Sequence, residues 1–280
     1  MIVKIILRIN PNLYGSFHHS KTNRLTKGTI LSFYCSQDNN NTLGTVNLLL
    51  KQYAIDINLT APQSDSGDGC TALMNSINLL EDKQRRFHLV KLLLKQPSLL
   101  INEVTNNEIK STALMTAAAL DSEKSCIQTL ELLLNHPGVD VDTQNNDGAS
   151  ALCIATKAKN VETVTLLLNR GADPNLATKK GMSALHYAAY NQMPEIVSLL
   201  ISIPDTNLNL QTNNNETALL LSLRDPRIGL ENTAEGPAQP TYESTLTLIA
   251  AGADLDAVNA QGKTALMLAC EHGALIVVEY

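Results

Sequence analysis

The sequence predicts an all-α protein built as a solenoid, in which similar helical units stack in one row. Three recurring features support this. A hydroxyl residue followed by Ala-Leu returns at Thr71, Thr112, Ser150, Ser183, Thr217 and Thr264, with a weaker form at Thr29. Aliphatic triplets follow at 48–50, 92–94, 132–134, 166–168 and 199–201, and an Asn or Asp follows each triplet. Markers that share one phase indicate repeats, each of which buries its apolar face against its neighbours.

The spacing of the hydroxyl residues gives the size of one unit. The two shortest intervals, Ser150 to Ser183 and Ser183 to Thr217, are 33 and 34 residues, so we expect a basic unit of about 33 residues with insertions elsewhere. The longest insertion, 225–241, holds three prolines and two glycines, which preclude a regular helix. It forms either a second interaction edge or a tolerated loop.

Each element of a unit has a local signal. The Thr or Ser suits the start of a first helix, where its hydroxyl satisfies a free backbone N–H group. The Leu triplets supply the apolar stripe of a second helix. Gly171 and Gly252 follow their triplets, where a left-handed helix end needs no Cβ. The stretches NNDG and TKKG predict tight turns before the next first helix.

The stretch 169–201, NRGADPNLATKKGMSALHYAAYNQMPEIVSLLI, resembles an ankyrin repeat. The resemblance covers 28–280 and implies an ankyrin-repeat solenoid of about six to seven helix-turn-helix units with β-turn fingers. Residues 1–27 are left as an N-terminal segment, part of a cap. The last repeat is incomplete because the chain stops near Ile276, Val277 and Val278, so we expect a fragment of a longer protein.

Composition argues against several functional classes. The net charge of −6 disfavours a protein that neutralises nucleic-acid phosphates. No apolar stretch reaches the roughly 18 residues that span a bilayer, and the N-terminus lacks a signal-peptide pattern. The five cysteines are scattered without a C-x-x-C pair, so we interpret them as reduced core thiols of a cytoplasmic protein.

Three features look like sites of chemistry, and each has a structural interpretation. His186 aligns with Met74, Met115, Cys153, Leu220 and Met267 of the other repeats. A position that accepts those residues needs no proton shuttle or metal ligand, so we expect His186 to pack or hydrogen-bond at the base of a finger.

The other two features are Gly262-Lys263-Thr264 and the pair Cys270 and His272. The first resembles the end of a phosphate-binding loop, but Ala257 stands where that motif needs glycine. Residues two apart on a helix do not face one another, so Cys270 and His272 form no catalytic pair. We therefore predict no enzyme activity, no metal and no cofactor.

The family resemblance places partner binding on the concave face, at finger tips and at exposed positions late in the first helices. Mapped onto this chain, the partner-binding residues are Gln144, Asn146, Asp147, Lys157, Lys179, Lys180, Met182, Tyr190, Asn191, Gln211, Asn213, Asn214, Arg224 and Glu271. Tyr190 stands out because aromatic anchors carry much of the binding energy of interfaces.

The leading hypothesis is a non-catalytic scaffold that binds a partner protein, with no nucleic acid, membrane span or small-molecule substrate. The alternative is a targeting module of a larger enzyme whose catalytic domain lies beyond residue 280. A third hypothesis concerns biology. Diverged repeats and Asn-rich runs such as DNNNT resemble the ankyrin-bearing effectors that intracellular bacteria inject into the host cytoplasm.

Overall fold

The computed structural model describes Leu31, Tyr34, Cys35 and the ranges 42–52, 56–60, 69–78, 82–120, 124–224 and 242–279. These residues belong to two compact units, Met1–Ala113 and Leu114–Tyr280, each of which is described by itself. The N-terminal segment 1–27 and the insertion 225–241 lie outside the described residues.

In the first unit, helix α6 (Lys83–Leu93) packs against both α4 (Thr42–Gln52) and α5 (Ala72–Asn78). Two side chains start these helices. Asp82 caps α6 and Thr71 caps α5, each accepting a hydrogen bond from the backbone N–H three residues later, at 3.0 and 3.3 Å.

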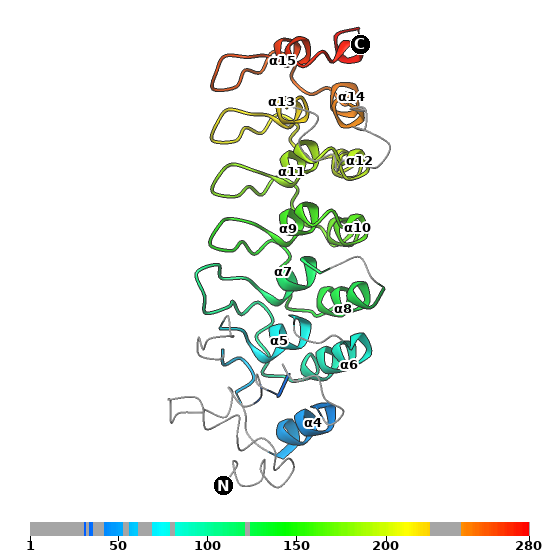
Figure 1. Cartoon of the computed structure of the whole chain (residues 1–280). Helices are drawn as coiled ribbons and strands as arrows, with labels where there is room; N and C mark the ends of the chain where they lie inside the picture. The colour runs from blue at the N-terminus through cyan, green and yellow to red at the C-terminus, as the bar shows by residue number, and fades with distance from the viewer. Residues whose placement is uncertain are drawn as a thin grey trace, which may run out of the picture. The chain divides into compact units, whose positions relative to one another are not determined.

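The second unit arranges its helices in two layers (Figure 1). The first helices of the repeats are α7 (Ala113–Ala118, which begins on the last residue of the first unit), α9 (Ala151–Lys157), α11 (Ala184–Tyr190), α13 (Ala218–Ser222) and α15 (Ala265–Glu271). The second helices are α8 (Lys124–Leu134), α10 (Val161–Asn169), α12 (Pro194–Ile201), α14 (Glu243–Ala250) and α16 (Leu275–Glu279). Each of α9, α11 and α13 contacts the next first helix, and α8, α10, α12 and α14 pack in sequence. With α5 and α6, the described residues contain six helix pairs and the further helix α4, which confirms the predicted six to seven repeats.

The hydroxyl residues start the first helices as predicted. Ser150, Thr217 and Thr264 adopt extended backbone, and each accepts a hydrogen bond from the N–H three residues later, at 3.3 to 3.4 Å. First helices of five to seven residues are too short to be stable alone. Packing between repeats must therefore supply most of their stability.

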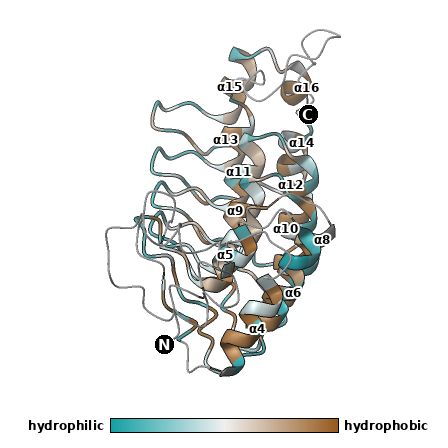
Figure 2. Ribbon diagram, turned by 60° about the horizontal axis from the view of Figure 1, so that its bottom comes forward, coloured by the Kyte–Doolittle hydropathy of each residue, from teal (hydrophilic) through white to brown (hydrophobic). Residues whose placement is uncertain are grey.

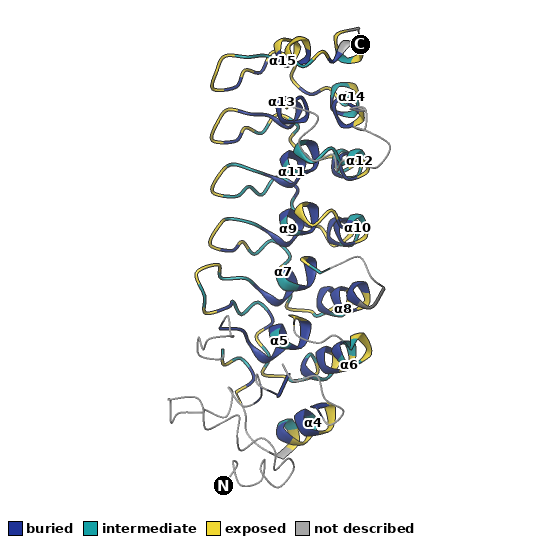
Figure 3. Cartoon of the chain, viewed as in Figure 1, coloured by how far each residue is buried: buried dark blue, intermediate teal, exposed yellow. Residues whose placement is uncertain are grey.

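That packing relies on small residues in the first layer and leucines in the second. Figure 3 shows both helix layers of the second unit largely buried and the finger tips exposed. Small side chains at one recurring position let neighbouring first helices approach closely; in this unit they are Ala117, Ala155, Ala188, Ser222 and Ala269, all buried. The second helices bury Leu133, Leu167, Leu200 and Leu248.

A finger precedes each of α9, α11, α13 and α15 and consists of a short hairpin. In the finger 178–182, the N–H of Thr178 donates to the carbonyl of Met182 at 3.0 Å, and Gly181 takes a φ of 76°. The same hydrogen bond closes the fingers at Asn145–Ala149, Thr212–Glu216 and Asn259–Lys263. Hydrophilic residues dominate the fingers, and the helices carry the apolar ones (Figure 2).

In the second unit, the Asn or Asp at positions 142, 175 and 209 joins one repeat to the next. The N–H of Asn175 donates to the carboxylate of Asp173 within its own turn, at 2.8 Å. The side chain of Asn175 then accepts from the N–H of Asn207 at 2.8 Å and donates to the carbonyl of Asp205 at 2.7 Å, both in the following repeat. Equivalent bonds run from Asp173 to Asp142 and from Asp254 to Asn209, at 2.9 Å each. The recurring Asn or Asp is therefore a cross-link between repeats.

One prediction about the cysteines is wrong. Cys35, Cys70, Cys126 and Cys153 are buried free thiols, but Cys270 is exposed. At the equivalent position in the preceding repeats, a following repeat covers the side chain, and no described residues cover Cys270 in this way. Among the described residues, no helix is both long and apolar enough to cross a membrane.

Candidate functional site

Two positions on or just after each of α9, α11 and α13 lie beside the fingers of the second unit. They are the fourth and seventh residues after the hydroxyl, which lie one helical turn apart and therefore share a face. The pairs are Ile154 and Lys157 on α9, Tyr187 and Tyr190 on α11, and Leu221 with Arg224 at α13.

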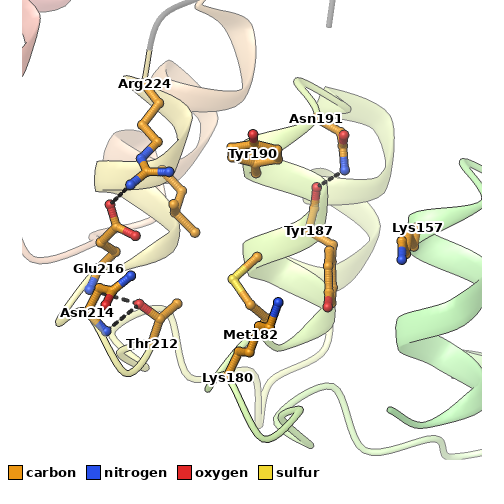
Figure 4. Close-up of a pocket in the computed structure, with 11 residues that line it drawn as sticks. Lys157, Lys180, Met182, Tyr187, Tyr190, Asn191, Thr212, Asn214, Glu216 and Arg224 are labelled. Carbon is orange, nitrogen blue, oxygen red and sulfur yellow. Dashed lines mark hydrogen bonds and ion pairs between the residues drawn. The ribbon is translucent and has the colours of Figure 1, made fainter. Parts of the chain in front are cut away.

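All of these side chains except Ile154, together with the neighbouring fingers, line a hollow of about 510 Å³ (Figure 4). Its walls come from three consecutive repeats, with Lys157 on α9, the two tyrosines on α11 and Arg224 just after α13. The lining residues are Lys157, Lys180, Met182, Tyr187, Tyr190, Asn191, Thr212, Asn214, Glu216, Leu221 and Arg224.

A second hollow of about 350 Å³ lies beside the first. The two share Lys157, Lys180 and Tyr187, so they form one continuous surface, called the finger–helix face below. The second hollow is lined by Asn145, Asp147, Ala149, Cys153, Ile154, Lys157, Thr178, Lys179, Lys180 and Tyr187.

The structure brings together nine of the fourteen residues expected to bind a partner. Lys157, Lys180, Met182, Tyr190, Asn191, Asn214 and Arg224 line the larger hollow, and Asp147 and Lys179 line the smaller one. Gln144, Asn146, Gln211, Asn213 and Glu271 line neither hollow.

Gln144, Asn213 and Glu271 each bind another part of the chain. Gln144 donates from Nε2 to the carbonyls of Gly148 and Ala177, at 2.6 and 3.0 Å. Asn213 donates from Nδ2 to the carbonyl of Lys179 at 2.8 Å. Both side chains therefore tie neighbouring fingers together. Glu271 forms an ion pair with Lys263.

Sequence reasoning missed four residues of the larger hollow, which are Tyr187, Thr212, Glu216 and Leu221. Tyr187 and Leu221 had a signal in the sequence, because each lies three residues before a predicted site residue and therefore shares its helix face. Thr212 and Glu216 close their finger through the backbone, and nothing in the spacing indicates that they also wall the hollow.

The finger–helix face has an uneven charge distribution. Arg224 pairs with Glu216 at 2.9 Å, and the Glu216 side chain is only 9% exposed while that of Arg224 is 49% exposed. Lys157, Lys179 and Lys180 are exposed, and none of the ion pairs between described residues includes them. Asp147 lines the smaller hollow beside them. The face therefore presents three lysines to solvent in a chain of net charge −6.

His186 lies buried beneath this face and joins two repeats. Its Nε2 faces the carbonyls of Leu210 and Glu216 at 3.0 and 3.1 Å. Its Nδ1 accepts from the N–H of Ser183 at 3.1 Å and lies 2.8 Å from the Ser183 hydroxyl. Carbonyls accept and the amide donates, so the ring is neutral with its proton on Nε2. Burial lowers its pKa, and hydrogen bonds to the carbonyls of Leu210 and Glu216 oppose the shift. The structural interpretation of His186 is confirmed.

Other reactive groups near the face are not activated. Burial raises the pKa of the Cys153 thiol, so the thiol stays protonated and is a weak nucleophile. Burial also raises the pKa of Tyr187. In the part of the chain that the structure describes, no three His, Cys, Asp or Glu side chains gather as metal ligands.

The Gly262-Lys263-Thr264 stretch belongs to a finger and the helix after it. Gly262 takes a φ of 72° in the hairpin, and Thr264 caps α15. Lys263 pairs with Glu271 rather than lining a Gly-rich loop. The repeat therefore accounts for all three residues.

Comparison with known proteins agrees with this architecture. A family profile described as ankyrin repeats in three copies matches residues 82–178, 119–212 and 165–230, which together span just over half of the chain. The chain belongs to the ankyrin repeat family. The crystal structure of EF0377, an ankyrin repeat protein, superposes with a TM-score of 0.59 over 74% of this chain and 94% of that one. At 22% identity, it supports the ankyrin fold alone.

Similar curated proteins share the ankyrin region over a small part of their length. Neurogenic locus notch homolog protein 1 of Danio rerio is 35% identical over 111 residues, which cover 39% of this chain and 4% of that protein. The B-cell lymphoma 3 protein homolog of Mus musculus is 32% identical over 146 residues, covering 52% of this chain and 29% of that protein. Ankyrin repeats are in general protein-interaction modules, and this array shares that coarse function.

Proposed function

We propose that this ankyrin array is a non-catalytic scaffold that binds a partner protein on its finger–helix face. One observation carries the proposal. Three consecutive repeats build two adjoining hollows that combine tyrosines, aliphatic side chains and exposed lysines. Aromatic and apolar side chains within a polar rim are the usual composition of a protein-binding surface.

The candidate reactive groups among the described residues offer little to support catalysis. The Cys153 thiol is protonated, His186 is committed to hydrogen bonds between repeats, and Lys263 is paired with Glu271. These observations support a binding role. A catalytic domain elsewhere in a longer protein, a cytoplasmic location and delivery into a host cell stay predictions.

Site-specific photocrosslinking tests the face. A photoreactive phenylalanine analogue replaces Tyr190 in one version of the chain and Glu162 in another. Glu162 is an exposed residue on α10 of the neighbouring repeat, on the second helix layer. In cells that contain the natural partner, we expect a discrete crosslinked protein from position 190 and none from position 162.

The binding energy of Tyr190 supplies a second readout. Once the crosslinked protein is identified and purified, Tyr190→Ala should weaken its binding by about 1–3 kcal/mol without shifting the melting curve, because the side chain is an anchor outside the core. Equal crosslinking from both positions contradicts the proposal. So does normal binding by Tyr190→Ala together with loss of binding when 225–241 is replaced by a Gly-Ser linker.

A further inference from the structure

The charges on the finger–helix face point to a particular kind of partner. Lys157 projects from α9, and Lys179 and Lys180 come from the tip of one finger. All three are exposed, and within the described residues no carboxylate forms an ion pair with them. The face thus concentrates unpaired positive charge on a protein whose net charge is −6. Complementary charge on a partner would speed its encounter and fix its orientation.

The apolar part of the larger hollow lies within reach of these cations. Tyr190 and Tyr187 stand one turn apart on α11, and Met182 and Leu221 complete the wall. Figure 4 shows Lys180 and Met182 on the finger and Lys157 on the neighbouring helix α9, and all three line the larger hollow. A hollow of about 510 Å³ has room for one large side chain and part of the backbone that carries it. The arrangement therefore suits an apolar anchor with negative charge next to it.

Nucleic acid fits this face less well than protein. Asp147 lines the smaller hollow, where its carboxylate would repel a phosphate backbone. A phosphate-binding surface is generally much more positive than this one, and it belongs to a basic domain. Glu216 is already neutralised by Arg224, so a carboxylate of a protein segment can approach the lysines while the rest of the segment avoids Asp147.

We infer that the occupant is an acidic segment of a partner protein. It places a large aliphatic or aromatic side chain in the larger hollow against Tyr190 and Met182, and it sets Asp or Glu side chains against Lys157 and Lys180. This inference rests on the proposed function, since it specifies the chemistry of the partner that binds there.

Selection of peptides from a random display library on the full chain tests this chemistry directly. We expect the enriched peptides to carry a Leu, Ile, Met, Phe, Tyr or Trp flanked by Asp or Glu. Synthetic fluorescent copies of these peptides are then titrated by anisotropy at about 50 mM and about 300 mM NaCl, and higher salt should weaken their binding.

Variants that alter the charge at two positions test whether Lys157 and Lys180 bind the acidic side chains of the peptides. Lys157→Glu with Lys180→Glu should weaken peptide binding by about tenfold or more, because carboxylates then face carboxylates. Lys157→Gln with Lys180→Gln should give a smaller loss, because it removes attraction without adding repulsion. The matched control is Lys159→Glu with Lys95→Glu, which alters two exposed lysines that line neither hollow and should change binding less than about twofold.

Folding must be followed in parallel. Lys157 lies in the last turn of α9, where a cation interacts favourably with the helix end. The Glu variant should therefore have a slightly lower melting temperature. The Gln variant separates this effect from binding, because it adds no negative charge at the helix end.

The outcomes separate this inference from the proposed function. If the enriched peptides are neutral or basic and bind Tyr190→Ala more weakly than the natural chain, the acidic partner is overturned and the face remains the binding surface. Acidic peptides that bind Tyr190→Ala normally overturn both. A fluorescent random single-stranded oligonucleotide provides a further test. If it binds more tightly than the peptides and the Glu variant no longer binds it, both the acidic partner and the proposed function are overturned. No enrichment of peptides overturns the acidic segment, while photocrosslinking at position 190 still tests the face.

Discussion

At the scale of single residues, His186 replaces an apolar side chain with a hydrogen-bonded one. The equivalent residues Met74, Met115 and Leu220 are also buried, so the position is part of the core. The imidazole links Ser183 at the start of its own helix to the finger of the next repeat. This link exists only for the neutral ring, because a proton on Nδ1 would face the N–H of Ser183.

Stability should therefore depend on pH through His186. Its pKa in the folded chain lies below the ordinary value of 6.5. Well above pH 6.5, the imidazole of His186 is neutral in both the folded and the unfolded chain. As the pH falls below that value, the unfolded chain takes up a proton that the folded chain does not, and the free energy of unfolding drops by at most about 1.4 kcal/mol per pH unit.

The comparison with His186→Leu isolates this effect, because leucine occupies the equivalent position 220. The variant should be less stable near neutral pH by about 1–3 kcal/mol, since the N–H of Ser183 loses its acceptor. It should also lose less stability than the natural chain on acidification. Urea unfolding at about pH 7.5 and about pH 5.5 measures both quantities. An identical pH dependence in the two proteins would contradict this account.

At the scale of an element, the fingers 145–149, 178–182 and 212–216 each form a hairpin and also contact the next finger. The N–H of Asn213 donates to the carbonyl of Lys180 at 3.1 Å, and the N–H of Lys179 donates to the carbonyl of Asp147 at 2.8 Å. Gly181 lies where the two backbones approach, and it has a left-handed conformation. A Cβ at Gly181 would lie 2.7 Å from the Cα of Thr212.

Two glycines separate the cost of conformation from the cost of contact. Gly262 occupies the same finger position with a φ of 72°, but a Cβ there meets nothing within 4 Å. Gly262→Ala should lower the free energy of unfolding by about 1–2 kcal/mol, the cost of a left-handed residue with a side chain. Gly181→Ala has the same conformational cost and must also displace the next finger. It should therefore lower the free energy of unfolding by clearly more than Gly262→Ala does. Equal losses in chemical denaturation would show that the fingers adjust freely.

At the scale of the whole molecule, the neighbouring repeat decides which residues are core. Leu185 and Leu266 hold the same position after their hydroxyl residues, yet Leu185 is 2% exposed and Leu266 is 58% exposed. Met267 is likewise exposed where His186 is buried. A solenoid buries such residues by stacking, so stability is a sum of contributions from repeats and from the interfaces between them.

Alanine substitutions at these two leucines measure that difference. Leu185→Ala should cost about 2–5 kcal/mol, because it leaves a cavity between packed repeats. Leu266→Ala should cost less than about 1 kcal/mol, because its side chain is largely solvated already. Thermal and urea unfolding of both variants provide the test. A loss at Leu266 as large as that at Leu185 would mean that another molecule covers this face in solution.

The sequence alone predicts the repeat register, the helix starts and the finger turns, because each depends on residues close together in the chain. A hydroxyl caps the helix that follows it, and a glycine allows the left-handed turn at its own position. Nine of the fourteen site residues expected from the family resemblance line the two hollows, and their role in partner binding stays a prediction.

Tertiary structure decided how these similar repeats differ in their contacts. Gln144 and Asn213 match the pattern of binding residues, yet their side chains bind neighbouring fingers. Cys270 is exposed where its equivalents are core. The physical reason is the same in each case. A side chain's burial and its hydrogen-bond partners depend on the repeat stacked against it, which lies a full repeat away in sequence.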